Sequence, residues 1–172
     1  MKKLSTKTIV QIALLIAIEI VLTRFLSIQT PYVRIGFGFL PIAIIAMLHG
    51  PLLAGISYAV GDILGFMIFA TGPYFPGITV SALLTGVIYG LFIYKKPDSL
   101  VRVIIAVAIV TVVVRMGLTT LWLSMLWEDA FMALLPARVI AALIMAPVQV
   151  ICIRLAASER FYSILGTKAA VS

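Results

Sequence analysis

Charged residues are scarce in this chain of 172 residues. It contains 13 lysines and arginines and six aspartates and glutamates, so charged residues make up 11% of the sequence against 63% hydrophobic residues. Soluble globular proteins use roughly 25% charged residues. The composition therefore excludes an ordinary water-soluble fold and predicts an integral membrane protein.

The residues and motifs of common catalytic and metal sites are missing as well. The single cysteine, Cys152, has no partner for a disulfide, and the single histidine, His49, falls at a predicted turn with no second metal ligand nearby. The sequence contains no Walker A pattern and no serine in a nucleophile elbow. These absences argue against an ATPase, a metalloprotein and a serine hydrolase. We expect no catalytic residues, and neither a metal nor a cofactor bound by this chain.

Long apolar stretches separated by glycine, proline and polar residues divide the chain into predicted helices. A transmembrane helix needs about 20 apolar residues, and the first stretch lacks the cleavage site of a signal peptide, so we expect it to be retained. The second is short and ends before Pro51, which leaves it tilted, partial or continuous with the third. The prediction is an all-α transmembrane bundle, one membrane domain over 1–172, with six helices at roughly 8–26, 38–49, 51–70, 77–94, 100–118 and 134–157.

The distribution of lysine and arginine predicts the orientation in the lipid bilayer. Short cytoplasmic loops are enriched in these residues. With the N-terminus inside, the outer loops hold Arg34, Glu128 and Asp129, and both termini are cytoplasmic in a multi-pass protein of the cell membrane. The net charge of +7 is then a topology signal, and no nucleic-acid partner is expected. The cytoplasmic side would hold Lys2, Lys3, Lys7, Lys95, Lys96, Arg154, Arg160 and Lys168.

Five charges nevertheless lie within or at the ends of the apolar stretches: Glu19, Arg24, Asp62, Arg115 and Arg138. Charges within a membrane are costly and mark functional sites. All but Glu19 fall near the outer end of their helices, so they are predicted to line one cavity that opens outward. Alternatively, Asp62 pairs with an arginine between helices and the outer arginines extend to the headgroups. Glu19, nearer mid-membrane, is interpreted as a structural partner of an arginine.

Aromatic residues in the outer loops are a second candidate for ligand contact. Tyr74 and Phe75 stand between glycine and proline residues that would hold a short turn against the helix ends. Aromatic rings beside buried charges suit a flat, polar heterocycle, so this loop is predicted to be a lid. Trp122 and Trp127 fit either ligand contact or the aromatic belt at a membrane interface.

Small residues on the first helix suggest a different kind of contact. Ala13 and Ala17 are four residues apart and share one helical face, which would let another helix approach closely. Gly61 and Gly65 have the same spacing on the third predicted helix, where packing within the protein is the simpler explanation. The alanine pair lies towards the cytoplasmic half, away from the predicted cavity.

Taken together, these segments resemble the substrate-binding S components of energy-coupling-factor (ECF) vitamin transporters, and specifically the folate-specific members. The similarity covers nearly all of the predicted helices, and Ala13 and Ala17 match the small-residue motif that contacts the transmembrane coupling subunit in that family. Its most specific parts are 24–28 (RFLSI), 34–41 (RIGFGFLP), 61–65 (GDILG) and 72–81 (GPYFPGITVS).

The resemblance implies a non-enzymatic subunit that captures folate from outside. It would associate with a transmembrane coupling subunit and two cytoplasmic ATPase subunits, which use the ATP. Asp62 could accept hydrogen bonds from adjacent N–H groups of the pterin ring, and Arg24, Arg34 or Arg115 could clamp the carboxylates of the glutamate tail. With Tyr74, Phe75 and Trp122, these residues form the predicted binding site.

Three alternatives stay open at this point. The same architecture could bind another vitamin such as thiamine, although a cation would favour acidic and aromatic residues over several arginines. An integral membrane enzyme acting on lipid headgroups would use Asp62 and Glu19 as acid and base, but a convergent catalytic motif is missing. A purely structural membrane subunit would not need charges at the depth of a pocket.

Overall fold

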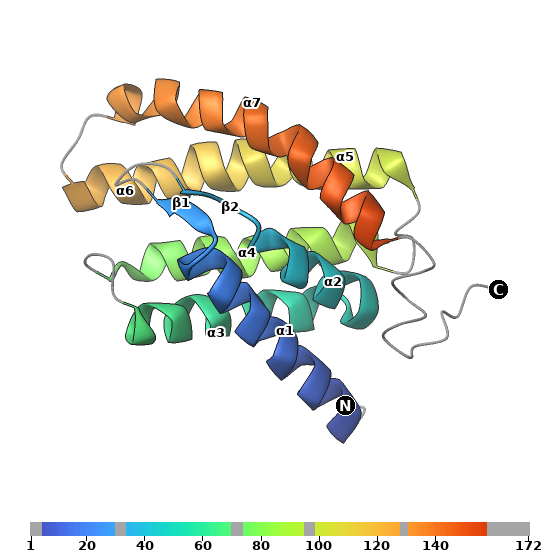
Figure 1. The fold of residues 1–172 in the computed structure, drawn as a ribbon. Coiled ribbons are helices and arrows are strands. Elements are labelled where there is room, and N and C mark those ends of the chain that lie inside the picture. Colours follow the sequence, from blue (N-terminus) through green and yellow to red (C-terminus); the bar gives the residue numbers. More distant parts are fainter. Residues whose placement is uncertain (1–4, 30–33, 70–73, 95–98, 128–130, 158–172) are drawn as a thin grey trace.

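The computed structural model describes residues 5–29, 34–69, 74–94, 99–127 and 131–157, and almost all of these are helical (Figure 1). A short antiparallel hairpin, β1 (Ser27–Gln29) with β2 (Arg34–Gly36), follows the first helix, with Ile28 opposite Ile35. The helices are α1 (Thr6–Arg24), α2 (Phe39–His49), α3 (Pro51–Ile68), α4 (Pro76–Ile93), α5 (Leu100–Ile109), the π-helix η1 (Val110–Leu118), α6 (Thr119–Trp127) and α7 (Phe131–Ala156).

Within the described part of the chain, five helical segments are long and apolar enough to cross a membrane: Thr6–Arg24, Pro51–Ile68, Pro76–Ile93, Leu100–Leu126 and Arg138–Ala156. Helix α2 is shorter and separate from α3. Gly50 lies between them with φ of 90°, a conformation that glycine adopts without steric cost, and a proline then starts α3. The fold is a membrane-type helical bundle in which α2 is a short, mostly buried helix.

Two predicted loops have regular structure instead. The stretch 119–127 was predicted as an outer loop, but it is helical, and η1 and α6 prolong α5 to Trp127. The hydroxyls of Thr119 and Thr120 donate to the carbonyls of Val114 (2.9 Å) and Arg115 (3.1 Å), which satisfies these groups inside the helix. The polarity of these threonines therefore does not end the helix, because both hydroxyls have partners within it. The hairpin likewise replaces part of the predicted loop at 27–38.

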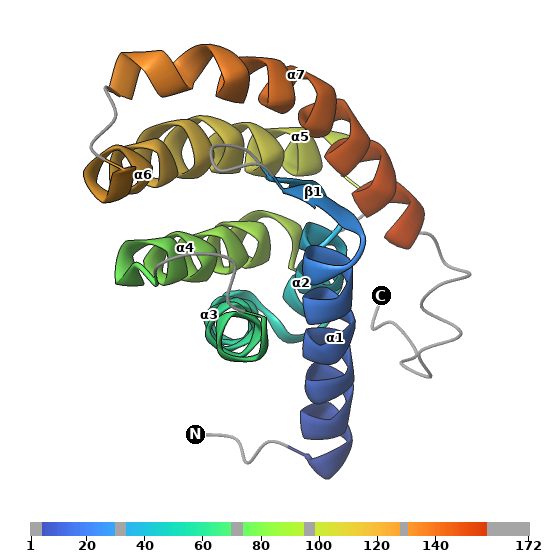
Figure 2. The same ribbon diagram turned by 60° about the vertical axis from the view of Figure 1, so that its left-hand side comes forward.

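Figure 2 shows α7 lying over the long α5–η1–α6 helix, which in turn lies over α4, with α3 on the far side of α4. Helices α3 and α4 pack closely because glycines leave room for the neighbouring backbone. A Cβ atom at Gly86 would come within 2.6 Å of the Ala54 carbonyl carbon, and one at Gly90 within 2.5 Å of the Pro51 nitrogen. Glycine is thus needed at this helix crossing.

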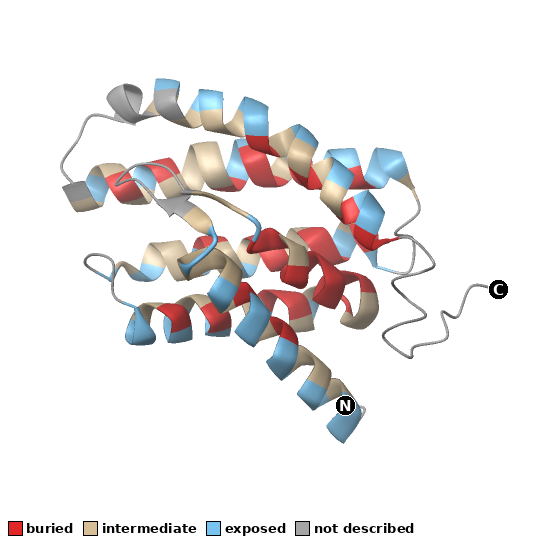
Figure 3. Ribbon diagram, viewed as in Figure 1, coloured by how far each residue is buried: buried red, intermediate tan, exposed pale blue. Residues whose placement is uncertain are grey.

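The buried core gathers on α2 and on the inner faces of the other helices (Figure 3). Helix α1 lies at the edge of the bundle with only Leu15 and Glu19 buried, whereas Ala13 and Ala17 are exposed. Large apolar side chains cover much of the outer surface, including Leu52 at 71% exposure and Leu143 at 71%. An apolar exterior of this extent fits contact with lipid.

Candidate functional site

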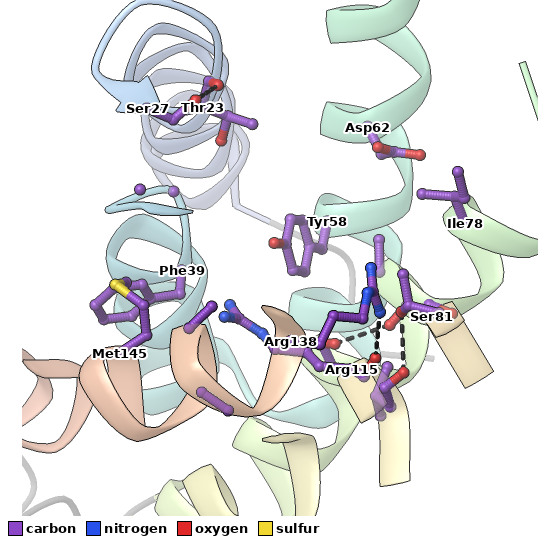
Figure 4. Close-up of a pocket in the computed structure, with 18 of the residues that line it drawn as sticks. Thr23, Ser27, Phe39, Tyr58, Asp62, Ile78, Ser81, Arg115, Arg138 and Met145 are labelled. Carbon is purple, nitrogen blue, oxygen red and sulfur yellow. Dashed lines mark hydrogen bonds between the residues drawn. The ribbon is translucent and has the colours of Figure 1, made fainter. Parts of the chain in front are cut away.

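A cavity of about 270 Å³ lies towards the hairpin end of the bundle (Figure 4). Its walls come from the C-terminal part of α1, the hairpin, the start of α2, the middle of α3, the first part and middle of α4, η1, α6 and α7. Segments far apart in the sequence therefore converge on one space. The helix ends that meet there are those that the sequence places on the outer side.

Four charged side chains line this cavity: Glu19, Asp62, Arg115 and Arg138. In Figure 4, Asp62 lies on one side of Tyr58 and the two arginines on the other. Tyr58 also lines the cavity and stands between these charges in this view. The site thus combines a wall that accepts hydrogen bonds with a wall that donates them.

The Asp62 carboxylate is held by a chain of hydroxyl groups from α4 and the segment before it. Thr79 donates to Asp62 Oδ2 at 2.8 Å, and the Tyr74 hydroxyl lies 3.0 Å from Thr79 Oγ1. Because the single proton of Thr79 goes to Asp62, Tyr74 must be the donor in the second contact. Tyr74 therefore reaches the site through Thr79 and is not itself among the lining residues.

Phe75 of the predicted lid and Trp122 lie beside the cavity. The rings of Phe75 and Trp122 are 5.7 Å apart, and a Cβ atom at Gly77 would be 2.6 Å from the Trp122 ring. Gly77 precedes Ile78, which lines the cavity. The aromatic pair thus covers the start of α4 next to the cavity.

Arg24 and Arg34 are the two further arginines that the sequence predicted for the site. Arg24 is not among the lining residues, and its guanidinium lies over Gly65 of α3, 3.1 Å from the position of a Cβ atom there. Arg34 belongs to β2, and its side chain lies outside the described residues.

Glu19, which the sequence analysis interpreted as a structural partner of an arginine, lines the cavity, as does Arg138. Glu19 is only 2% exposed and accepts a hydrogen bond from Thr23 at 2.7 Å. Its carboxylate lies against Gly61, where a Cβ atom would be 2.7 Å from Oε2. Arg138 donates to the Arg115 backbone carbonyl at 2.6 Å and to the Thr120 hydroxyl at 2.9 Å.

Helix α7 also provides a buried amide that contacts Arg115. With the Gln149 amide nitrogen donating to the Tyr89 hydroxyl oxygen at 3.0 Å, its oxygen accepts from Arg115 Nη1 and Nη2 at 3.0 and 3.1 Å. This orientation is assigned because the opposite one would turn the amide nitrogen towards the guanidinium donors. Gln149 and Tyr89 are both fully buried.

Ser81 is a further residue that the sequence analysis missed. It lines the cavity, is 4% exposed, and its hydroxyl has no hydrogen-bond partner among the described residues. A buried hydroxyl without a partner is costly unless a ligand or water supplies one. Neither serine nor threonine is unusual in an apolar helix, so sequence carries little signal for Ser81 or Thr79. Gln149, an amide within a long apolar stretch, was a detectable signal.

A bundle of apolar helices around one charged cavity is the architecture of a membrane protein that binds a polar solute. The chain belongs to the family of ECF transporter substrate-specific components, whose family model matches residues 7–156. This confirms the resemblance seen in the sequence. The members of this family are transporter subunits and not enzymes.

Named relatives and a solved structure agree with this assignment. The chain is 50% identical over 153 residues to the folate transporter FolT of Clostridium novyi (strain NT), covering 89% of this chain and 88% of that protein. It is 36% identical over 154 residues to the folate transporter FolT of Leuconostoc mesenteroides, with 86% and 83% covered. The crystal structure of FolT bound with folic acid matches with a TM-score of 0.85 and 40% identity, covering 91% of this chain and 95% of that one.

Proposed function

We propose that this chain is the folate-binding substrate-specific component of an ECF-type vitamin importer, and that it captures folate from outside the cell with high affinity. The observation that carries the proposal is the cavity with a carboxylate towards one side and two arginines towards the other. The relatives named as folate transporters and the folic-acid-bound neighbour support it.

The chemistry of folate suits this division of charge. Its pterin ring carries adjacent N–H groups, which the Asp62 carboxylate can accept, and Ser81 offers a hydroxyl that still lacks a partner among the described residues. Its glutamate tail is anionic, and arginine binds carboxylates through paired N–H groups. Arg115 and Arg138 would receive the anionic end, while Tyr74, Phe75 and Trp122 cover the neighbouring part of α4. In this proposal Arg24 and Arg34 stay candidates for the mouth of the site.

The proposed partners are a transmembrane coupling subunit and two cytoplasmic ATPase subunits that supply ATP hydrolysis. The family assignment supports this assembly. The exposed face of α1 with Ala13 and Ala17 is the proposed contact with the coupling subunit, since small residues permit close helix packing. The orientation that we propose, in the cell membrane with both termini cytoplasmic, follows from the lysine and arginine distribution.

Isothermal titration of the purified protein with folate, thiamine and riboflavin tests the binding proposal. We expect tight binding of folate without ATP or any partner subunit, because the cavity is built from this one chain. Thiamine, a cation, should bind much more weakly, since it has no carboxylate for Arg115 and Arg138. An absence of folate binding by folded protein, or tighter binding of thiamine, would overturn the assignment.

A further inference from the structure

We propose that Gln149 is a positioning residue that holds the Arg115 guanidinium in place for an anionic ligand group without neutralising its charge. This inference rests on the proposed function and deepens it, because it explains how the site keeps a cation available to folate. Gln149 does not line the cavity and would act only through Arg115.

The geometry fixes both ends of the Gln149 amide. Its nitrogen donates to Tyr89 of α4, and its oxygen accepts from both terminal nitrogens of Arg115 in η1, all at 3.0 to 3.1 Å. Gln149 and Tyr89 are each 0% exposed, so water cannot replace either contact. The amide therefore restrains the guanidinium from behind, with three helices contributing to one chain of hydrogen bonds.

This anchor leaves most of the guanidinium free. Arginine has five N–H donors, and the Gln149 oxygen takes one from each terminal nitrogen, so three remain for other acceptors. Arg115 also lines the cavity. Donors that the amide does not occupy are thus available where a ligand carboxylate would lie.

The important property of the Gln149 side chain is that it is a neutral amide and carries no charge. A buried arginine is usually paired with a carboxylate, which cancels its charge. Among the described residues, the side-chain partner of the Arg115 guanidinium is the neutral amide of Gln149. Arg138 also uses neutral acceptors in its contacts with the Arg115 carbonyl and the Thr120 hydroxyl. The site therefore holds Arg115 with a group that carries no opposing charge, and a bound anion would supply it.

The first experiment asks whether Gln149 acts through Arg115. Gln149→Met keeps a similar volume but removes the acceptor, so we expect folate affinity to fall by about tenfold. In an Arg115→Met background, the same change should cause no further loss, because the group that Gln149 positions is gone. Equal losses in the two backgrounds, measured by isothermal titration, would show that Gln149 supports only the fold and would overturn the proposal.

The second experiment asks whether the neutrality of the anchor matters. Gln149→Glu keeps an acceptor for Arg115, and its second oxygen can accept from the Tyr89 hydroxyl, which then becomes the donor, so the melting temperature of the ligand-free protein should not fall. Folate affinity should nevertheless fall by about tenfold or more, since an ion pair cancels the charge that the ligand needs. Gln11→Glu is the matched control, because it adds the same charge on α1 away from the lining residues and should leave folate affinity unchanged.

These outcomes separate this inference from the proposed function. Wild-type protein that does not bind folate refutes the proposed function. Wild-type protein that binds folate tightly while Gln149→Glu binds it equally well refutes only the role of Gln149. An equal loss in Gln11→Glu would likewise refute it, because the effect would then come from net charge and not from the anchor.

Discussion

Replacement of Asp62 by asparagine is the most direct test of the acceptor side of the cavity. The carboxylate has about four lone-pair sites, and Thr79 occupies one of them on Oδ2 at 2.8 Å. In Asp62→Asn the amide oxygen would accept that same hydrogen bond, which would turn the NH2 group towards the cavity. Ligand N–H groups that met an acceptor would then meet a donor.

The size of the effect follows from this mismatch. Leaving one buried polar contact unsatisfied costs about 1–3 kcal/mol, which corresponds to a loss of affinity of roughly 5- to 150-fold. Isothermal titration with folate gives the affinity, and the melting temperature of the ligand-free protein verifies that the variant is folded. Unchanged folate binding by folded Asp62→Asn would refute the contact and return Asp62 to a structural role between helices.

Thr79→Val is the matched control for this experiment. It keeps the volume of the side chain and the charge of Asp62 but removes the hydroxyl that holds the carboxylate and links it to Tyr74. One ordinary hydrogen bond contributes about 0.5–1.5 kcal/mol, so affinity should fall by only about 2- to 13-fold. A larger loss in Thr79→Val than in Asp62→Asn would show that Thr79, and not Asp62, makes the main contact.

Two further predictions concern surfaces away from the cavity. Ala17→Trp should leave folate binding intact yet abolish co-purification with the coupling complex and folate uptake by cells. Ala108→Trp, at an exposed alanine of α5, is the control and should leave both co-purification and uptake intact. Normal uptake by Ala17→Trp would show that this face only contacts lipid. Gly90→Ala should lower the free energy of unfolding in detergent by about 1–3 kcal/mol, because the new Cβ meets the backbone of Pro51. Gly117→Ala, where the nearest atom is 3.6 Å away, should cause no loss, and equal melting temperatures for both variants would contradict the packing argument.

The sequence alone determined the class of protein and the depth of its charges. A low content of charged residues and long apolar stretches required a membrane bundle, and a helix rises 1.5 Å per residue, so each charge could be assigned a level along its helix. Asp62 and Arg115 were placed near the outer ends of their helices in this way, and the structure finds both on the wall of one cavity at the hairpin end. Regular rise along a helix is a local property, which is why it could be predicted.

The tertiary structure decided which side chains face the cavity. Arg24 lies at the predicted level, but the packing of α1 against α3 turns it over Gly65, while Glu19, one turn and a residue earlier, lines the cavity. The contact between Gln149 and Arg115 joins residues on helices that only the folded bundle brings together. Position in the sequence sets how deep a residue lies, but the rotation of each helix and its neighbours set what its side chain meets. The contacts of a side chain depend on packing across the whole bundle, and therefore only the tertiary structure shows them.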